Sequence, residues 1–384
     1  MADTFNFYGK LFMPQSKGNF QPYSEKQSPK GWQVRNLRFL CNTDAGNQFL
    51  NLNGNKLPDE SNFLYFNTNN NERIKIPFKD RKFPENINRV PRHQKFIVDL
   101  ETNQERRNKL RNAIRKINQG EDISHEEMTD LGVESISEIE NAYRDSMKLY
   151  KEFLSAWDFI DYVRKMLESG KYKNSTFKVS GRISASHFND KDYISYEPNS
   201  IILANNGTED PATARVTVFF DSDGLEWNED TKQFDLNSFI EYYDSTSKKR
   251  QYAPYPIVIS LAEDTDENLL KRKKKYFEEL FGVKSSTEVY KLGIVVDLVN
   301  GSVKKTITYD DLDESTKQMI DFNLITLDEI RQNQSSQFRG ETVQASFFKK
   351  VQPNFLHGSQ EASVSADQLG YVLDIDYDDE ELPF

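Results

Sequence analysis

The stretch Thr176-Phe177-Lys178-Val179-Ser180-Gly181-Arg182-Ile183-Ser184-Ala185 shows the pattern on which the fold of this chain depends. Apolar residues or glycine occupy every second position, and polar residues lie between them. Because successive side chains of a β-strand point to opposite faces, this alternation predicts a strand with one buried and one solvent-facing side. Two cations, Lys178 and Arg182, belong to the solvent-facing side.

The first hundred residues contain more segments of strand composition, separated by turns rich in Asn, Gly and Asp. In Trp32–Cys41 the apolar alternation shifts phase after Val34, and a β-bulge near Asn36 would account for the shift. Five or six short strands in about 100 residues are typical of a small barrel or sandwich. The strands expected here are Phe5–Phe12, Trp32–Cys41, Gln48–Leu52, Asn62–Asn67, Arg73–Phe78 and Gln94–Leu100.

Residues 104–168 change to helical character. Gln104–Asn118 predicts a basic helix, and Ser124-His125-Glu126-Glu127 is a capping box that predicts the start of a second, short helix. Ser137–Glu168 has no Gly or Pro over 32 residues and carries an apolar stripe at three- and four-residue steps. We expect this stretch to be helical, and to pack on the barrel, link two domains or mediate self-association into a homo-oligomer.

Strand patterns resume at residue 176, interrupted by a polar insertion at Asp221–Tyr252 and a charged helix at Asn268–Phe281. Two helical pieces follow at Ser315–Asn323 and Thr326–Asn333, and a Ser/Gln/Gly-rich tether is expected from Phe355 to Gly370. The strands expected in this half are Thr176–Ala185, Tyr193–Tyr196, Ser200–Ala204, Ala214–Phe220, Pro256–Ala262 and Val289–Val299.

These patterns predict an α+β protein with one or two small β-barrels, helical insertions and a flexible acidic C-terminal tail. The expected division is a basic barrel at 1–103, a helical segment at 104–170, a second β region with helical additions at 171–350, and a tether with an acidic tip at 351–384.

The charge of the chain is unevenly distributed. Residues 1–118 hold 21 Lys and Arg against 11 Asp and Glu, whereas the remainder holds 29 against 50. A basic front and an acidic rear suit a protein that binds a polyanion at one end. No segment is apolar for long enough to cross a bilayer, no secretory signal is visible, and Cys41 is the single cysteine. We therefore expect a cytoplasmic protein with a buried thiol and no membrane partner.

The best candidate for nucleic-acid binding is Arg73–Lys95, in which cations are interleaved with Phe78 and Phe83. Single-stranded DNA binding requires this mixture, because cations contact phosphates and exposed rings stack on bases. Arg35 and Arg38, with Trp32 or Phe39, would extend this surface, and Lys178, Arg182 and Arg215 in the second β region are weaker candidates. The candidate cations within Arg73–Lys95 are Arg73, Lys75, Lys79, Arg81, Lys82, Arg89, Arg92 and Lys95.

Residues suited to catalysis are nearly absent from the sequence. Four widely spaced histidines and one cysteine give no zinc-ligand spacing, and there is no phosphate-binding Gly-rich loop or nucleophile elbow. Asp221, Asp223 and Glu226 cluster after an expected strand and would suit a divalent ion, although an acidic turn is the commoner reason for such a cluster. We therefore expect no cofactor, no metal and no enzymatic activity.

The last nine residues are Asp376-Tyr377-Asp378-Asp379-Glu380-Glu381-Leu382-Pro383-Phe384. They resemble the C-terminal tip of bacterial single-stranded DNA-binding proteins (SSB), in which an acidic run with an aromatic residue precedes an aliphatic residue and a final Pro-Phe. Glu381 is one extra acid relative to that pattern. Such an end is captured by a partner through the aromatic ring, the terminal carboxylate and the flanking acids. Every residue of this tip, from Asp376 to Phe384, is therefore a candidate partner-binding residue.

The resemblance implies an OB-like, phage-type SSB protein in the cytoplasm of a bacterial host. It would coat single-stranded DNA without sequence preference and recruit host replication, recombination and repair proteins through the tip. Two alternatives remain open at this point. One is a mimic of the SSB tip that binds host proteins but no DNA, and the other is a metal-dependent nuclease or recombination enzyme that carries the tip.

Overall fold

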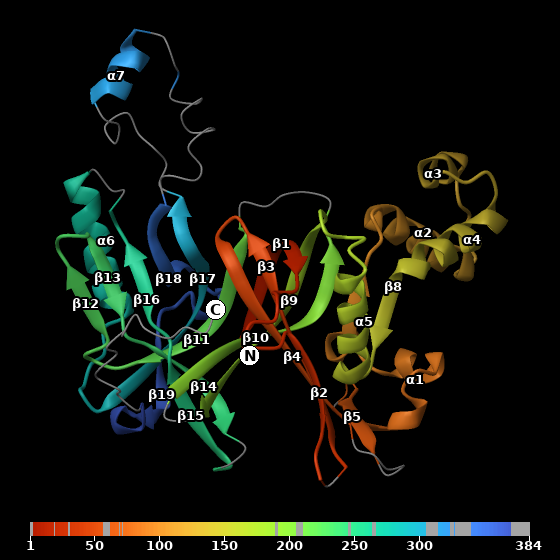
Figure 1. The fold of residues 1–384 in the computed structure, drawn as a ribbon, viewed down its shortest axis with the longest axis horizontal. Coiled ribbons are helices and arrows are strands. Elements are labelled where there is room, and N and C mark those ends of the chain that lie inside the picture. The colour runs from red at the N-terminus through yellow and green to blue at the C-terminus, as the bar shows by residue number, and fades with distance from the viewer. Residues whose placement is uncertain are drawn as a thin grey trace.

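The computed structural model describes residues 3–369 apart from 19, 30, 57–61, 69, 71, 189–190, 205–209, 245–246, 263–265, 305–313, 323–325 and 327–338. It is a mixed α+β protein, as the sequence predicts, and it has one large β-sheet and several helices (Figure 1). The expected helix at Thr326–Asn333 falls almost wholly outside the described residues.

The strands of the N-terminal half are β1 (Thr4–Phe12), β2 (Tyr23–Gln27), β3 (Gln33–Thr43), β4 (Gly46–Lys56), β5 (Phe63–Asn67), β6 (Arg73–Pro77), β7 (Phe96–Asp99) and β8 (Tyr150–Phe153). Those that follow are β9 (Thr176–Phe188), β10 (Lys191–Leu203), β11 (Ala212–Phe220), β12 (Leu225–Asn228), β13 (Gln233–Leu236), β14 (Phe239–Asp244), β15 (Lys249–Pro254), β16 (Ile257–Ser260), β17 (Glu288–Lys304), β18 (Arg339–Val351) and β19 (Gln360–Ser365).

The helices are α1 (Pro84–Arg89), α2 (Gln104–Asn118), α3 (His125–Leu131), α4 (Ile136–Ser146), α5 (Ala156–Glu168), α6 (Glu267–Leu280) and α7 (Glu314–Asp321). Figure 1 shows α2, α3 and α4 together at one side of the molecule and α6 at the opposite side. The bounds of α2 are those expected from the sequence, and the predicted capping box at Ser124 and Glu127 is formed at the start of α3.

Strand β1 lies in the middle of the sheet and pairs with β9, β11 and β3, all antiparallel. Its alternation places Phe5 and Phe7 in the core, and β9 likewise buries Phe177 and Val179, as its sequence predicts. Strands β4 and β7 both pair with β10. Strands from residues 1–103 and 171–350 therefore belong to one sheet, while the division of the chain into four domains stays a prediction.

A β-bulge joins two segments that the sequence suggested were separate strands. Tyr193–Tyr196 and Ser200–Ala204 both fall in β10, whose register against β9 shifts between Pro198 and Ser200. Opposite this bulge, a Cβ on Gly181 would lie 2.0 Å from the carbonyl oxygen of Glu197. Glycine is needed at this position because only a residue without a side chain permits so close an approach.

The expected bulge near Asn36 is wrong. Strand β3 pairs with β4 residue by residue from Gln33 to Thr43, without a register shift. The phase of the apolar pattern changes for another reason: Arg35 lies on the same side of β3 as the buried Leu37, but there it contacts Trp157 of α5. A cation covered by a helix thus interrupts an otherwise regular alternation.

The single helix expected at Ser137–Glu168 is also wrong. Strand β8 separates α4 from α5 and pairs antiparallel with β7. Ser155 then begins α5, where its hydroxyl accepts a hydrogen bond from the backbone N–H of Trp157. Pairing with an available strand edge outweighed helix propensity, which is a weak preference by comparison.

Two further expectations about the second half are corrected. The polar insertion at Asp221–Tyr252 contains β12, β13, β14 and part of β15. The expected tether from Phe355 is ordered as far as Leu369, because β19 pairs with β17 and Leu369 is fully buried. The strand β18 was not foreseen, and it pairs along much of β17.

Candidate nucleic-acid interface

The solvent-facing side of β9, β1, β3 and β4, which we call the open face, carries aromatic rings and cations in adjacent rows. Residues paired directly across antiparallel strands point to the same side of a sheet, so the register defines the rows. The first two rows pair β9 with β1: Ser180–Asn6 and Lys178–Tyr8. The next two run from β1 across β3 to β4: Lys10–Asn42–Asn47 and Phe12–Leu40–Phe49. The last row, Arg38–Asn51, pairs β3 with β4 beyond the end of β1.

Two rings on this face are partly exposed to solvent. Phe12 is 37% exposed and Phe49 is 47% exposed, and they flank Leu40 on the intervening strand. Lys10 and Arg38 are exposed in the rows before and after. A hydrophobic core would not leave these rings outside, whereas a surface for stacking nucleobases requires them there.

The cations of the open face continue along β1 beyond these rings. The Lys178 ammonium lies 5.6 Å from the ring centroid of Tyr8. At the start of β1, Thr4 pairs with Arg182 on one side and with Arg215 on the other. Arg182 forms a 2.6 Å ion pair with Glu197, and Arg215 is exposed. From Thr4 to Phe12 the track spans about 26 Å, at roughly 3.3 Å per residue.

A partly buried carboxyl group lies beside the start of this track. The Asp3 carboxylate accepts a 2.9 Å hydrogen bond from the backbone N–H of Thr217. Burial raises the pKa of Asp3 to about 6, although the Thr217 hydrogen bond and the N-terminal amine favour the charged form. The thiol of Cys41 lies beneath the open face, and burial raises its pKa to about 12, in agreement with the expected buried thiol.

A second surface of the same chemistry is the β5–β6 hairpin. Its inner side packs Phe66, Ile74 and Ile76 against Val90 and Leu154. Its outer side forms a ladder of rings and cations: the guanidinium of Arg73 lies 4.2 Å from the Tyr65 ring centroid, and the ammonium of Lys75 lies 3.8 Å from that of Phe63. This ladder contains the predicted residues Arg73 and Lys75.

Two of the predicted arginines serve the fold. The Arg35 guanidinium lies 3.7 Å from the Trp157 ring centroid and also donates to Glu25 and to the carbonyl oxygen of Trp157. Arg81 forms a two-pronged ion pair with Asp158, at 2.5 and 2.9 Å. Arg35 connects α5 to β3, and Arg81 connects α5 to the turn after β6. Neither guanidinium is therefore available to phosphates.

Two of the predicted aromatic residues are in the interior. Phe39 is 1% exposed and Phe78 is 6% exposed, so neither ring can reach a base in this structure. Trp32 is 43% exposed just before β3, and Phe83 is half exposed. The cations Lys79, Lys82, Arg89 and Arg92 are exposed, whereas Lys95 is buried and forms a 2.7 Å ion pair with Glu152.

The sequence analysis did not single out the rings and the cation at the centre of the open face: Tyr8, Lys10, Phe12 and Phe49. The alternation of β1 contains the signal for three of them, because Tyr8, Lys10 and Phe12 lie on the opposite side of the strand from the buried Phe5, Phe7 and Leu11. Their proximity to Phe49 depends on the pairing of β3 with both β1 and β4, which no local pattern reveals.

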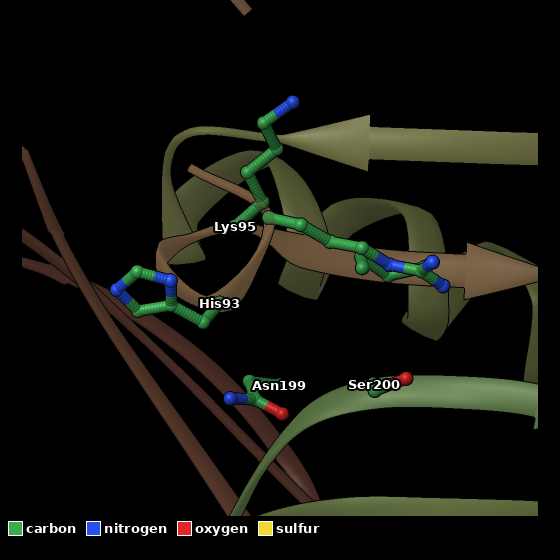
Figure 2. A pocket seen from close by; sticks show the side chains of 6 residues that line it. His93, Lys95, Asn199 and Ser200 are labelled. Carbon is green, nitrogen blue, oxygen red and sulfur yellow. The ribbon is translucent and has the colours of Figure 1, made fainter. Parts of the chain in front are cut away.

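A depression of about 400 Å³ lies where the loop before β7 faces β10. Its lining residues are Arg92, His93, Lys95, Ile97, Asn199 and Ser200. Figure 2 shows His93 and Lys95 on one wall, with Asn199 and Ser200 facing them from β10. The side chain of Lys95 points away from Asn199 and Ser200, toward its ion pair with Glu152.

Asp221 and Asp223 lie at a turn, whereas Glu226 lies in β12. The Asp221 carboxylate accepts a 3.1 Å hydrogen bond from the backbone N–H of Asp223. Within the described part of the chain there is no group of three or more His, Cys, Asp or Glu side chains that could hold a metal ion. In the same part, no helix is long and apolar enough to cross a membrane. The tip from Asp376 to Phe384 lies outside the described residues.

No family model and no curated protein matches the sequence. Among solved structures, the chain is similar to a deletion mutant of the single-stranded DNA-binding protein from Thermus aquaticus. The similarity has 8% sequence identity and a TM-score of 0.28, and it covers 78% of this chain and 87% of that chain. A TM-score this low does not establish a shared fold.

Proposed function

We propose that this protein binds single-stranded DNA without sequence preference along the open face, and that its tip recruits other proteins to the coated strand. The observation that carries the proposal is the row Phe12–Leu40–Phe49, flanked by the exposed cations Lys10 and Arg38. Exposed rings between cations are the combination that single strands need, because each nucleotide offers one base plane and one phosphate.

The binding mechanism needs no chemical step. Unpaired bases stack on Phe12 and Phe49, and phosphates lie along Lys10, Arg38, Lys178 and Arg215. A duplex cannot use the rings, because its base planes are already stacked on one another. Preference for single strands therefore follows from the rings, and the absence of sequence preference follows because every base has a flat face.

The hairpin and the form of the sheet extend this proposal. We assign the outer ladder of β5–β6, with Tyr65, Arg73 and Lys75, as a second contact for the same strand. The coiled, mostly antiparallel strands around β1 are proposed to act as an OB-like binding sheet, an architecture that presents such faces to single strands. The protein would be non-catalytic and cofactor-free, in the cytoplasm of a bacterial host.

Recruitment rests on the resemblance of Asp376–Phe384 to the SSB tip. Phe384 is the proposed anchor, since it unites an aromatic ring and the terminal carboxylate in one residue. Adding one glycine after Phe384 keeps the acids and the ring but moves the carboxylate away. The extended protein should bind oligo-dT normally yet fail to bind a bacterial protein that recognises SSB tips. Equal binding of that partner by both proteins would refute capture of the chain end.

Fluorescence anisotropy with labelled oligo-dT and a duplex of equal length tests DNA binding. We expect tight binding of oligo-dT, weak binding of duplex, and a steep decrease in affinity with salt. Substituting both Lys10→Gln and Arg38→Gln should lower the log–log salt slope by about 1.4, at roughly 0.7 per phosphate contact. Arg111→Gln, which removes an exposed cation of α2, is the control and should leave the slope unchanged.

The same titration distinguishes this proposal from the mimic. A protein that only imitates the SSB tip would bind the tip-recognising partner and show no affinity for oligo-dT. That result, with a folded protein, would refute DNA binding by the open face while leaving the role of the tip intact.

A further inference from the structure

The depression between the loop before β7 and β10 has the composition of an anion site. Arg92 and His93 are exposed at its rim, and Asn199 and Ser200 supply an amide and a hydroxyl from β10. None of its six lining residues is acidic. The nearby carboxylate of Glu152 is 2.7 Å from the ammonium of Lys95, and that of Glu197 is 2.6 Å from Arg182, so each of these acids already has a cation partner.

The β10 bulge shapes one wall of this depression. The register of β10 against β9 omits Asn199, because it shifts between Pro198 and Ser200. Residues left out of a ladder in this way are aimed differently from their neighbours, and such bulges are common beside binding sites. Figure 2 shows Asn199 on the wall of the depression opposite His93.

The sheet register connects the depression to the open face. Ser200 pairs with Ser180, and Ser180 pairs with Asn6 of β1, so the three side chains point to the same side of the sheet. Two strand spacings, about 10 Å in total, therefore separate Ser200 from the track along β1. This is a distance that a short segment of flexible single strand can bridge.

The opposite wall is connected to the hairpin. The Gln94 amide donates to the carbonyl oxygen of Asn67 at 2.6 Å, and its oxygen accepts from the Asn67 N–H at 2.9 Å. Asn67 is the last residue of β5 and pairs with Arg73. These two bonds hold the turn that bears Arg92 and His93 against the end of the ring-and-cation ladder. The depression thus lies between the two proposed DNA-binding surfaces.

We propose that this depression binds a phosphate group of the DNA strand where the strand crosses from the open face to the hairpin. Arg92 supplies positive charge and N–H donors, and His93, whose Nε2 lies 3.3 Å from the amide nitrogen of Gln94, adds a ring nitrogen; Asn199 and Ser200 donate from the other wall. The inference rests on the proposed function, because it assigns one phosphate of the same bound strand. A free phosphate ion offers the same chemistry, so the experiment has an arm for each source.

The test compares the full-length protein with the double variant Arg92→Gln, His93→Gln. The matched control is Arg111→Gln, His125→Gln, which removes the same two residue types from exposed positions on α2 and α3. Oligo-dT affinity is measured from 0.05 to about 1 M salt, where loss of one phosphate contact should lower the slope by roughly 0.7. The affinity of the double variant, divided by that of the unmodified protein, should therefore be about fivefold lower at about 0.1 M salt than at about 1 M salt. The control should match the unmodified protein.

The second arm uses inorganic phosphate alone. At constant ionic strength, phosphate should raise the melting temperature of the unmodified protein above its value in chloride, and the double variant should lose this shift. Asn199→Asp, which places a carboxylate opposite Arg92 and His93, should abolish the same shift without removing a cation. Circular dichroism establishes that each variant is folded, and because the two variants alter opposite walls, misfolding of one leaves the other as the test.

The outcomes separate the proposals. A reduced slope together with a lost phosphate shift supports a strand phosphate in the depression. If the double variant loses the phosphate-induced rise in melting temperature but keeps the slope of log affinity against log salt, the site binds free phosphate. That result overturns binding of a strand phosphate in the depression. An unchanged slope and no phosphate shift in the unmodified protein refute the site, while oligo-dT binding that depends on Lys10 and Arg38 would still support the open face. If the unmodified protein binds no oligo-dT, the proposed function and the crossing both fail.

Discussion

Replacing Phe49 by alanine is the most direct test of the open face, because it removes a stacking surface and no charge. The ring is 47% exposed and lies beside Leu40, with Phe12 on the far side of that residue. A base stacked on an aromatic side chain contributes about 1–3 kcal/mol. At roughly 1.4 kcal/mol for each factor of ten, oligo-dT affinity should decrease by about 5- to 150-fold.

The salt dependence identifies the cause of that loss. Phe49→Ala should weaken binding at every salt concentration without changing the log–log slope, because the number of phosphate contacts is unaltered. Tyr243→Ala removes a more exposed ring from β14, outside the four strands of the open face, and serves as the control. Anisotropy titrations of both variants at four salt concentrations measure the effect. Unchanged affinity in a folded Phe49→Ala protein, or an equal loss in both variants, would refute stacking on the open face.

Three further predictions concern stability and the tip. Arg35→Ala should lower the free energy of unfolding by about 2 kcal/mol, because the variant loses the contact with Trp157 and the charged hydrogen bonds. The salt dependence of oligo-dT binding should stay unchanged. Denaturant unfolding measures the first effect and fluorescence anisotropy the second. Asp3→Asn should stabilise the protein by about 2–3 kcal/mol at pH 7. The reason is that the pKa of Asp3 in the folded protein, about 6, exceeds its ordinary value of 3.8. The unmodified protein therefore loses stability as the pH rises from about 4 to 6. Unfolding curves of this variant and the unmodified protein should coincide below about pH 4, and a constant difference across pH would contradict burial of the charge as the cause. Deleting Phe384 should abolish binding of a tip-recognising partner in a pull-down and spare oligo-dT binding, and retention of the partner would show that the tip is only an acidic solvating segment.

Much of the secondary structure was predictable because its signals are local. The alternation in β9 and β1 predicted which side of each strand is buried, since the side chains of a strand repeat every two residues. Helix α2 and the capping box of α3 were also foreseen, because they depend on neighbouring residues alone. Strand β8 was not, because a four-residue strand within a helix-compatible sequence forms only where β7 offers it a partner.

The sequence by itself determined that the chain is α+β and that its first 118 residues are basic, and the proposed role of the tip rests on its last nine residues alone. Only the tertiary structure decided which cations and rings are available to a ligand. Arg81 is held by Asp158, which lies 77 residues away, whereas Phe12 and Phe49 are brought to one row by strands that meet at Leu40. The physical reason is that local periodicity determines on which side of an element a residue lies, while exposure and ion pairing depend on what the rest of the chain places against that side.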